Sequence, residues 1–348
     1  MMASAQHDPG KIHAAIEAVI EKRQKKSAVA KRHGVSAAVV SGWIKKYQDM
    51  SPADIAAAQA TKIDNRYIRV MRRLFEKHMT AGAKSFTWDR REIREIAKEL
   101  DFEAPSNFGD VIYSIRHGRD ELPKEIRDLA PKGKHWLLLP NGKGKYKFVL
   151  ATFSLIDPQF RPAIKIPDAT PQIVARYALG DEQAVLARVR YNRLVDIFLS
   201  VTSSALQSHL RATVEAFNKS QIETDELYVG VDVAGAQYII PIQAKGLDEN
   251  VGAVQAIQDV YCCREKFPTL ICRAIAAKTV EIQKGDDGND IHTIALMELA
   301  IAGDFDVWVA RQERYQLVPA NKISGKELEE YRRAAATRIP HLHKKTAR

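Results

Sequence analysis

Residues 223–246, with the sequence ETDELYVGVDVAGAQYIIPIQAKG, decide the fold expected for the C-terminal half of the chain. Two runs of strand-forming residues flank the small residues VAGA, which predicts an antiparallel hairpin with its turn near Ala234 and Gly235. This register brings the acidic start of the first strand opposite the polar end of the second: Asp225 and Glu226 lie opposite Gln243 and Ala244. We therefore expect acidic side chains to meet Gln243 and Lys245, which share one face of their strand.

Carboxylates that converge on a lysine suit the hydrolysis of a phosphodiester bond. The acidic cluster consists of Glu223, Asp225 and Glu226. A hard divalent cation binds carboxylate and carbonyl oxygens, contacts the scissile phosphate and lowers the pKa of an attacking water. The ammonium of Lys245 can contact the phosphate or position that water. The alternative is a surface hairpin whose lysine is simply solvated.

At these residues the sequence resembles the PD-(D/E)xK nucleases, in which an acidic residue begins one strand and (D/E)-x-K follows on the next. Asp225 matches the first acid and Lys245 the lysine, whereas Gln243 stands at the usual second acid. A Q-x-K variant is familiar in the Mrr-like branch, which commonly pairs a winged-helix DNA-binding region with the nuclease domain. Glutamine supplies a neutral oxygen, so the site has one charge fewer unless Glu226 or Glu223 makes up the difference.

The resemblance implies an α/β restriction-endonuclease-like core with a central mixed sheet. It also implies Mg²⁺-dependent (or Mn²⁺-dependent) cleavage of double-stranded DNA in restriction or modification-dependent defence. Asp225, Gln243 and Glu226 would bind the cation, and Lys245 would assist the attack on phosphorus. A cut in both strands needs two such sites, so a homodimer is expected. Gln258 on the following helix resembles the glutamines that some branches place beside the nucleic acid, although it equally fits a polar helix face.

The flanking patterns extend this α/β interpretation. Apolar residues at helical spacing predict a long helix over 181–217, on which Asp196 is expected to form a salt bridge. After the lysine, residues 246–250 lead into another helix, and TLICRAIAA at 269–277 predicts a buried parallel strand. Strand, helix and parallel strand form the crossover expected at this point.

The 348 residues include 53 Lys and Arg against 43 Asp and Glu, a net charge of +10 with neutral His. The 45% of hydrophobic residues excludes wholesale disorder, and the length favours two or three domains. The surplus charge favours nucleic acid, although an anionic membrane surface fits it too.

We expect a cytoplasmic protein, because the sequence shows no membrane span, no signal peptide and too few cysteines for a disulfide framework. It also lacks a phosphate-binding glycine loop, so ATP is not indicated.

The first basic region contains AVAKRHGVSAAVVSGWIKKY at 28–47, which predicts two short helices joined at Gly34. Apolar residues lie at the spacings where a helix-turn-helix buries its core: Val29, Ala30, Val35, Val40 and Trp43. Small outward residues let the second helix approach DNA, and lysines at its end reach phosphates. The residues assigned to DNA contacts are Ser36, which also caps the helix, Ser41, Lys45 and Lys46. The alternative is a basic helical hairpin that packs against the rest of the chain.

The second basic region predicts a winged helix. Residues 89–100 form an amphipathic helix, Ser106 begins a second helix, and WLLLPNGKGKYKFVLA at 136–151 forms a hairpin around Asn141-Gly142. DNA contacts are assigned to the second helix and to the wing: Asn107, Arg116, Arg119, Lys143, Lys145 and Lys147. The alternative is a solvated basic hairpin on an ordinary α+β module.

The sequence thus predicts a multidomain protein with a helix-turn-helix at 1–57, a winged helix at 63–156, a nuclease domain at 167–323 and a basic helical tail at 324–348. We expect a DNA endonuclease. The rival is a DNA-binding regulator or transposon-associated protein whose nuclease fold is inactive, with Gln243 as the sign of a lost ligand. An RNA-binding or RNA-cleaving protein fits the charge equally but gains nothing from two helical modules of DNA-binding type.

Overall fold

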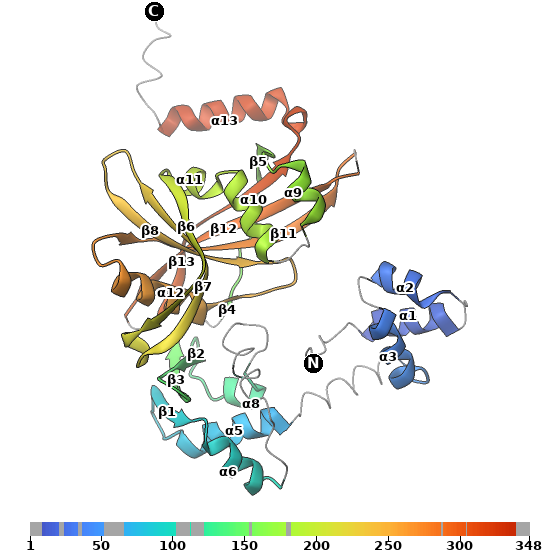
Figure 1. Ribbon diagram of the computed structural model, residues 1–348, viewed down its shortest axis with the longest axis vertical. Helices are drawn as coiled ribbons and strands as arrows, with labels where there is room; N and C mark the ends of the chain where they lie inside the picture. The colour runs from blue at the N-terminus through green and yellow to red at the C-terminus, as the bar shows by residue number, and fades with distance from the viewer. Residues whose placement is uncertain are drawn as a thin grey trace, which may run out of the picture. The chain divides into compact units, whose positions relative to one another are not determined.

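The computed structural model describes the following residues of the chain: 9–20, 24–33, 37–51, 66–101, 112, 122–152, 155–178, 182–286, 288–303 and 305–338. The chain divides into two compact units: unit 1 holds 1–74 with 94–105, and unit 2 holds 75–93 with 106–348. Figure 1 labels the helices and strands of both units. The division into four domains expected from the sequence stays a prediction.

Unit 1 begins with three helices that share a small core. They are α1 (Pro9–Ile20), α2 (Lys26–His33) and α3 (Ala37–Tyr47). The core contains apolar residues from all three helices: Ile12, Ala15, Ile16, Val29, Ala30, Val40 and Trp43. The burial predicted for four of these residues, Val29 to Trp43, is confirmed. Gly34, Val35 and Ser36 lie outside the described residues.

Unit 1 also includes the first part of α5 (Arg66–His78) and the last part of α6 (Glu92–Glu99). Helix α6 confirms the amphipathic helix predicted over 89–100, with Ile96 and Ala97 buried. Arg73 Nε donates a hydrogen bond of 2.7 Å to Glu99 Oε1 and so joins the two helices.

Unit 2 is built on a mixed sheet of eight strands (Figure 1). Seven strands follow the order β5 (Ile164–Pro167), β13 (Asp306–Val318), β12 (Asp290–Ala302), β11 (Ala274–Lys284), β8 (Gln237–Lys245), β7 (Ser220–Val231) and β6 (Thr202–Val214). The eighth, β10 (Ile271–Cys272), pairs with β8. Strands β10 and β11 run parallel to β8, and β5 runs parallel to β13, while the other pairs are antiparallel. The mixed sheet expected from the sequence is confirmed.

Each face of this sheet has its own core because side chains alternate along a strand. The covering helices are α10 (Glu182–Tyr191), α11 (Leu194–Leu199) and α12 (Ala253–Lys266). In β11, Ala274 and Ala276 pack in the core that contains α12, whereas Ile275 and Ala277 pack in the core that contains α10 and α11. A strand buried on both faces is apolar at every buried position, which explains the apolar residues AIAA at 274–277 that begin β11.

Strand β8, helix α12 and strand β11 form the predicted parallel crossover. In the register of β8 and β11, Ile242 pairs with Ile275 and Lys245 pairs with Lys278. The predicted hairpin of β7 and β8 is also present. The two lysines are therefore neighbours at the carboxyl end of β8, where its parallel pairing with β11 stops and β11 continues to Lys284.

Residues 202–214 form strand β6, so the single helix predicted over 181–217 is wrong in its second half. Helix α11 ends at Leu199, and Ser200 after it has a φ of +57°. Leu206, Leu210 and Val214 are spaced by four residues, which fits one face of a strand as well as one face of a helix. Hydrogen bonding to β7 along the whole segment decides in favour of the strand.

A second, three-stranded antiparallel sheet contains the hairpin predicted at Asn141-Gly142. Its order is β1 (Ser85–Asp89), β3 (Lys145–Ala151) and β2 (His135–Pro140). Aromatic rings fill one side of it, where the ring centroid of Phe75 lies 5.1–5.2 Å from those of Phe86, Trp136 and Phe148. These edge-on ring contacts are the favoured geometry for buried aromatic side chains.

The other side of the same hairpin belongs to the core of the large sheet. Leu137, Leu139, Val149 and Ala151 pack in the cluster that includes the apolar face of α12. The hairpin is thus one structural body with the large sheet rather than a separate projecting wing.

The remaining described elements are short or lie at the surface: α8 (Lys124–Arg127), β4 (Leu155–Ile156), β9 (Val251–Gly252), α9 (Gln172–Tyr177), α13 (Gly325–Arg338) and the 3₁₀ turns Glu215–Phe217 and Ala320–Lys322. Helix α13 confirms the charged helix predicted in the tail. Within the described residues, no helix has both the length and the apolar character that a membrane crossing requires.

Candidate functional site

The candidate site lies where β7 and β8 meet, at the carboxyl end of β8. Asp225 Oδ2 accepts a hydrogen bond of 2.9 Å from the backbone N–H of Ala244, between Gln243 and Lys245. The backbone of β6 is irregular beside it: Ser208 and Leu210 pair with the neighbours of Asp225 on β7, while His209 between them has a φ of +50°. The hairpin therefore joins the acid to the Q-x-K segment, as the sequence predicts, but its register differs by one residue from the predicted one, because Glu226 pairs with Ile242 rather than with Gln243.

Gln243 has a hydrogen-bond partner on each side of its amide group. Its Nε2 donates to Asp259 Oδ2 at 2.7 Å, and its Oε1 accepts from Gln255 Nε2 at 3.0 Å. The other oxygen of Asp259, Oδ1, accepts from Thr224 Oγ1 at 2.5 Å. Helix α12 thus places a buried carboxylate directly behind the glutamine.

Lys245 is almost fully buried, with 5% of its side chain exposed, and its ammonium forms an ion pair with Glu182 at the start of α10. Lys278 lies beside Lys245 on the adjacent strand, and partner residues in a ladder point to the same face. The Nζ of Lys278 is 3.5 Å from Oδ1 of the exposed Asp157. The site therefore contains two neighbouring cations, each with one acidic partner.

Two acidic residues predicted to support the site lie elsewhere. Glu226 is fully buried, pairs with Arg190 of α10, and accepts a hydrogen bond of 3.1 Å from the hydroxyl of Tyr228. Glu223 is half-buried and pairs at 3.1 Å with Arg211 of β6. The structure does not bring Glu226 to Gln243, because consecutive residues of a strand point to opposite faces. The expectation that Glu226 supplies the missing charge is not met by this geometry.

Burial governs the proton affinity of the two carboxylates at the site. Desolvation raises the pKa of Asp225 to about 6, against the opposing attraction of Lys245, and the nearby Glu182 carboxylate raises it further. Desolvation also raises the pKa of Asp259 to about 7, although Thr224 and Gln243 donate hydrogen bonds to its charged form. Shifted carboxylates at a strand end, beside a buried lysine, are typical of functional sites.

The donor set suits a hard divalent cation such as Mg²⁺ or Mn²⁺. The described residues contain no group of three His, Cys, Asp or Glu side chains that could hold a metal ion. Mg²⁺ does not need such a group, because it keeps several waters and binds one or two carboxylates together with substrate phosphates. Asp225 and the side-chain carbonyl of Gln243 are the oxygen donors that the candidate site offers for such a cation.

Sequence reasoning missed Asp259 and Glu182. Asp259 follows Gln255 and Gln258 at helical spacing, and this polar stripe on an otherwise apolar helix could have revealed it. Gln258 is buried, and its Nε2 has no hydrogen-bond partner among the described residues, as is also true of Gln255 Oε1. No pattern in the sequence indicates that Glu182 belongs to the site, because its partner Lys245 is distant along the chain.

The residues predicted to contact DNA in unit 1 are described only in part. In α3, Ser41 is half-buried and Lys45 is exposed. Lys46 also belongs to α3. Ser36 lies outside the described residues, so its predicted capping role has no structural account.

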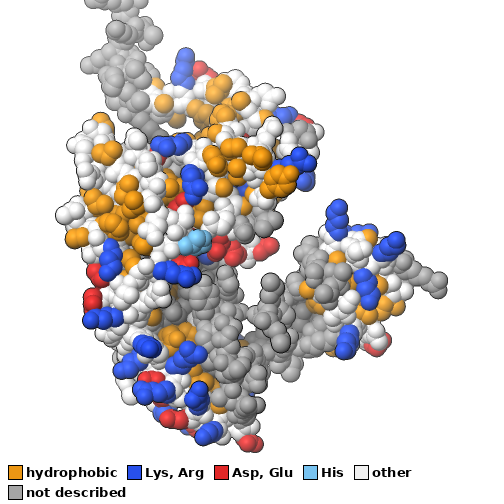
Figure 2. All heavy atoms as spheres, viewed as in Figure 1, with side chains coloured by type: hydrophobic (Ala, Val, Ile, Leu, Met, Phe, Trp, Pro, Cys, Tyr) orange, Lys and Arg blue, Asp and Glu red, His pale blue; other side chains and the backbone are white. Residues whose placement is uncertain are grey.

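The residues predicted to contact DNA in the second basic region are also described only in part. Asn107, Arg116 and Arg119 lie outside the described residues, and only Ile112 of that predicted helix is described, as helical and buried. On the hairpin, Lys143 and Lys145 are exposed, whereas the Nζ of Lys147 lies 5.5 Å from the ring centroid of Phe305. Figure 2 shows Lys and Arg side chains over the region of β1, α5 and α6.

The tip of the hairpin is anchored to the turn that precedes β7. The N–H of Gly142 donates to Ser220 Oγ, and Asn218 Nδ2 donates to Asn141 Oδ1, both at 2.8 Å. A Cβ at residue 142, where φ is +104°, would lie 3.2 Å from the carbonyl oxygen of Asn218, which favours glycine. The predicted wing is therefore a tethered hairpin in this unit.

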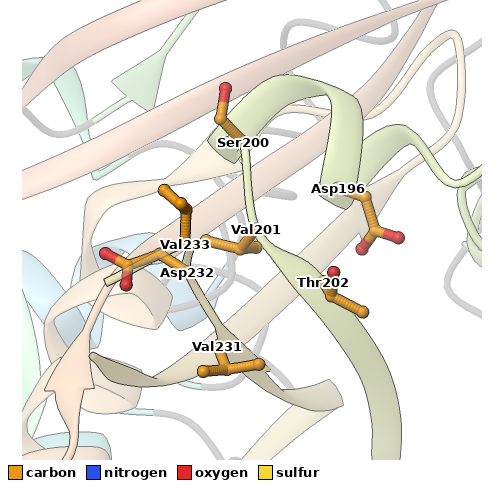
Figure 3. A pocket seen from close by; sticks show the side chains of 7 residues that line it. All are labelled: Asp196, Ser200, Val201, Thr202, Val231, Asp232 and Val233. Atoms are coloured by element: carbon orange, nitrogen blue, oxygen red, sulfur yellow. The ribbon is translucent and has the colours of Figure 1, made fainter. Parts of the chain in front are cut away.

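A shallow hollow lies at the opposite end of the β7–β8 hairpin from Lys245 (Figure 3). It is lined by residues of α11, β6 and the hairpin turn: Asp196, Ser200, Val201, Thr202, Val231, Asp232 and Val233. Asp196 pairs with Arg193 and accepts a hydrogen bond of 2.9 Å from the N–H of Ser203. This confirms the salt bridge expected for Asp196 and separates it from the candidate site.

Comparisons of the chain with protein-family models, with curated proteins and with solved structures found no match.

Proposed function

We propose that this protein is a Mg²⁺-dependent DNA endonuclease of restriction or modification-dependent type. One observation carries the proposal: Asp225 is hydrogen-bonded to the backbone between Gln243 and Lys245, at the end of a parallel strand pair where Lys278 is the next residue across. A carboxylate joined to a strand segment that carries an amide and an ammonium brings together the kinds of group that phosphodiester hydrolysis uses.

Each residue has a role that follows from its position. Asp225 would hold the cation through Oδ1, the oxygen that does not accept from Ala244, and Gln243 would add its side-chain carbonyl. When bound, Mg²⁺ supplies positive charge at the scissile phosphate and lowers the pKa of a nearby water. Lys245, oriented by its ion pair with Glu182, would stabilise the negative charge that develops on phosphorus-bound oxygens.

The neighbouring cation supports a polyanionic substrate. Lys278 lies on the same face as Lys245, and its acidic partner Asp157 is 70% exposed, so the pair is weak and easily replaced by a phosphate. The surplus of +10 charges and the exposed Lys45 of α3, together with exposed Lys143 and Lys145 of the hairpin, favour nucleic acid as that polyanion. Cleavage of both strands of a duplex would require two copies of the site, which favours a homodimer.

A second candidate function is DNA binding without cleavage, by a regulator or transposon-associated protein. It is favoured by the hydrogen bonds that already occupy both ends of the Gln243 amide, and by the ion pair that holds Lys245. A site in which every ligand already has a protein partner could be purely structural.

Incubation with plasmid DNA separates the two functions. Wild-type protein, Asp225→Asn and the matched control Glu223→Gln are incubated with methylated and unmethylated plasmid in Mg²⁺ or in EDTA. Glu223 is a suitable control because it lies on the same strand but pairs with Arg211 at the surface. Cleavage that requires the metal, is lost in Asp225→Asn and persists in Glu223→Gln supports the nuclease. Tight binding of every plasmid without cleavage supports the regulator.

A further inference from the structure

Gln243 and Asp259 form a pair that accounts for the glutamine. Asp259 is 2% exposed and lies on α12, and its Oδ2 is 2.7 Å from the Gln243 amide nitrogen. A carboxylate at position 243 would lie within the same distance of a second buried carboxylate. Two such groups cannot both ionise in one dry site, so a carboxylate at position 243 is incompatible with an ionised Asp259.

We propose that Asp259 is a positioning residue, which supplies from α12 the negative charge that position 243 lacks and fixes the Gln243 carbonyl oxygen as a cation ligand. The inference rests on the proposed function, because it concerns the cation of that site. It identifies glutamine and Asp259 together as the equivalent of one carboxylate on the strand.

The orientation of the amide follows from the chemistry of its partner. The Nε2 of Gln243 donates to Asp259 Oδ2 and its Oε1 accepts from Gln255 Nε2, so the oxygen end of the amide is the end that does not face Asp259. Thr224 Oγ1 donates to the second oxygen of Asp259 and prevents the carboxylate from turning. The carbonyl oxygen of Gln243 accepts one bond, from Gln255, which leaves a lone pair for a further partner.

Two buried polar atoms next to this pair point to a missing partner. Gln255 Oε1 and Gln258 Nε2 are buried without hydrogen-bond partners among the described residues. An unmet buried donor and an unmet buried acceptor each cost free energy, and waters around a cation would satisfy both.

The test exchanges the charge between the two positions. Wild type, Asp259→Asn, Gln243→Glu and the double variant Gln243→Glu/Asp259→Asn are titrated with Mg²⁺ alone at pH 8, above the pKa of about 7 of Asp259. Binding is followed by the shift in melting temperature. Glu265→Gln is the matched control, because Glu265 is on the same helix but its partners are Lys266 and the backbone N–H of Glu215, and glutamine keeps an oxygen that can accept from that N–H. Circular dichroism in EDTA verifies that each variant is folded.

The inference predicts that Asp259→Asn binds Mg²⁺ about tenfold more weakly than wild type, the usual effect of losing a residue that orients a metal ligand. Gln243→Glu is expected to melt at a lower temperature than wild type in EDTA. The double variant, with one carboxylate again, should regain both the Mg²⁺ response and the melting temperature, and Glu265→Gln should match wild type.

Wild-type affinity in Asp259→Asn, or a double variant that binds no better than Asp259→Asn, would overturn the inference while leaving the proposed function intact. A wild-type protein whose melting temperature does not respond to Mg²⁺ would overturn the cation site itself, and the inference with it.

Discussion

Replacing Asp259 with asparagine should change how the stability of the protein depends on pH. The side chain is buried, and burial raises its pKa from the ordinary value of 3.8 to about 7 in the folded protein. Between these values the folded state keeps a proton that the unfolded state has released. The free energy of unfolding therefore falls as pH rises through this window.

The size of the effect follows from the pKa difference. Each pKa unit corresponds to about 1.36 kcal/mol, and the difference is roughly three units. Asp259 should therefore lower the free energy of unfolding of the wild type by about 4 kcal/mol as the pH rises from about 4 to about 7. Asparagine resembles the protonated acid in shape and does not titrate. The variant should equal wild type in stability near pH 4 and exceed it by up to that amount above pH 7.

Urea denaturation in EDTA, followed by circular dichroism at several pH values, measures the difference directly. Asp232→Asn is the control, since Asp232 lies at the opposite end of the hairpin and its pKa is lowered, chiefly by a hydrogen bond from Tyr238. Wild-type and Asp259→Asn curves that stay parallel from pH 4 to pH 8 would refute the buried, proton-binding carboxylate.

Three further substitutions test the packing and the DNA contacts. Phe148→Ala removes a fully buried ring from the aromatic cluster and should lower the free energy of unfolding by about 3–5 kcal/mol; a loss below about 1 kcal/mol would contradict the packing described. Ser220→Ala removes the acceptor of the Gly142 N–H and should cost about 1 kcal/mol in the same urea assay, whereas unchanged stability would mean that the hairpin tip is not anchored there. Lys278→Ala should weaken DNA binding and reduce the slope of log affinity against log salt by about 1, and an unchanged slope would remove Lys278 from the phosphate contacts.

The sequence predicted the parts of the fold that depend on local pattern. The alternation in 223–246 indicated the β7–β8 hairpin, and the run TLICRAIAA indicated the parallel strand β11, because a strand buried on both faces has no polar positions. The Asn141-Gly142 dipeptide indicated its hairpin because glycine there tolerates a positive φ.

Two sequence predictions were wrong: the helix over the second half of 181–217 and the place of Glu226 beside Gln243. Leu206, Leu210 and Val214 satisfy helix and strand periods equally, and only pairing with β7 makes 202–214 a strand. Glu226 is adjacent to Asp225 in sequence, yet strand alternation sends it to Arg190 on the opposite face.

The partners of the site could not be predicted, because they come from distant segments. Glu182 meets Lys245 only when α10 packs on the sheet, and Asp259 meets Gln243 only through the crossover helix. Both contacts depend on tertiary packing, which the periodicity of a single segment does not specify.

The most direct test of the central claim is the cleavage of plasmid DNA by wild type and Lys245→Ala, in Mg²⁺ and in EDTA. Lys219→Ala is the control, because Lys219 is an exposed lysine of the same sheet region whose partner is Glu215. The account predicts nicked or linear plasmid with wild type and Lys219→Ala in Mg²⁺, none in EDTA, and none with Lys245→Ala although that variant still binds DNA. Cleavage by Lys245→Ala at the wild-type rate, or wild-type cleavage that persists in EDTA, would contradict it.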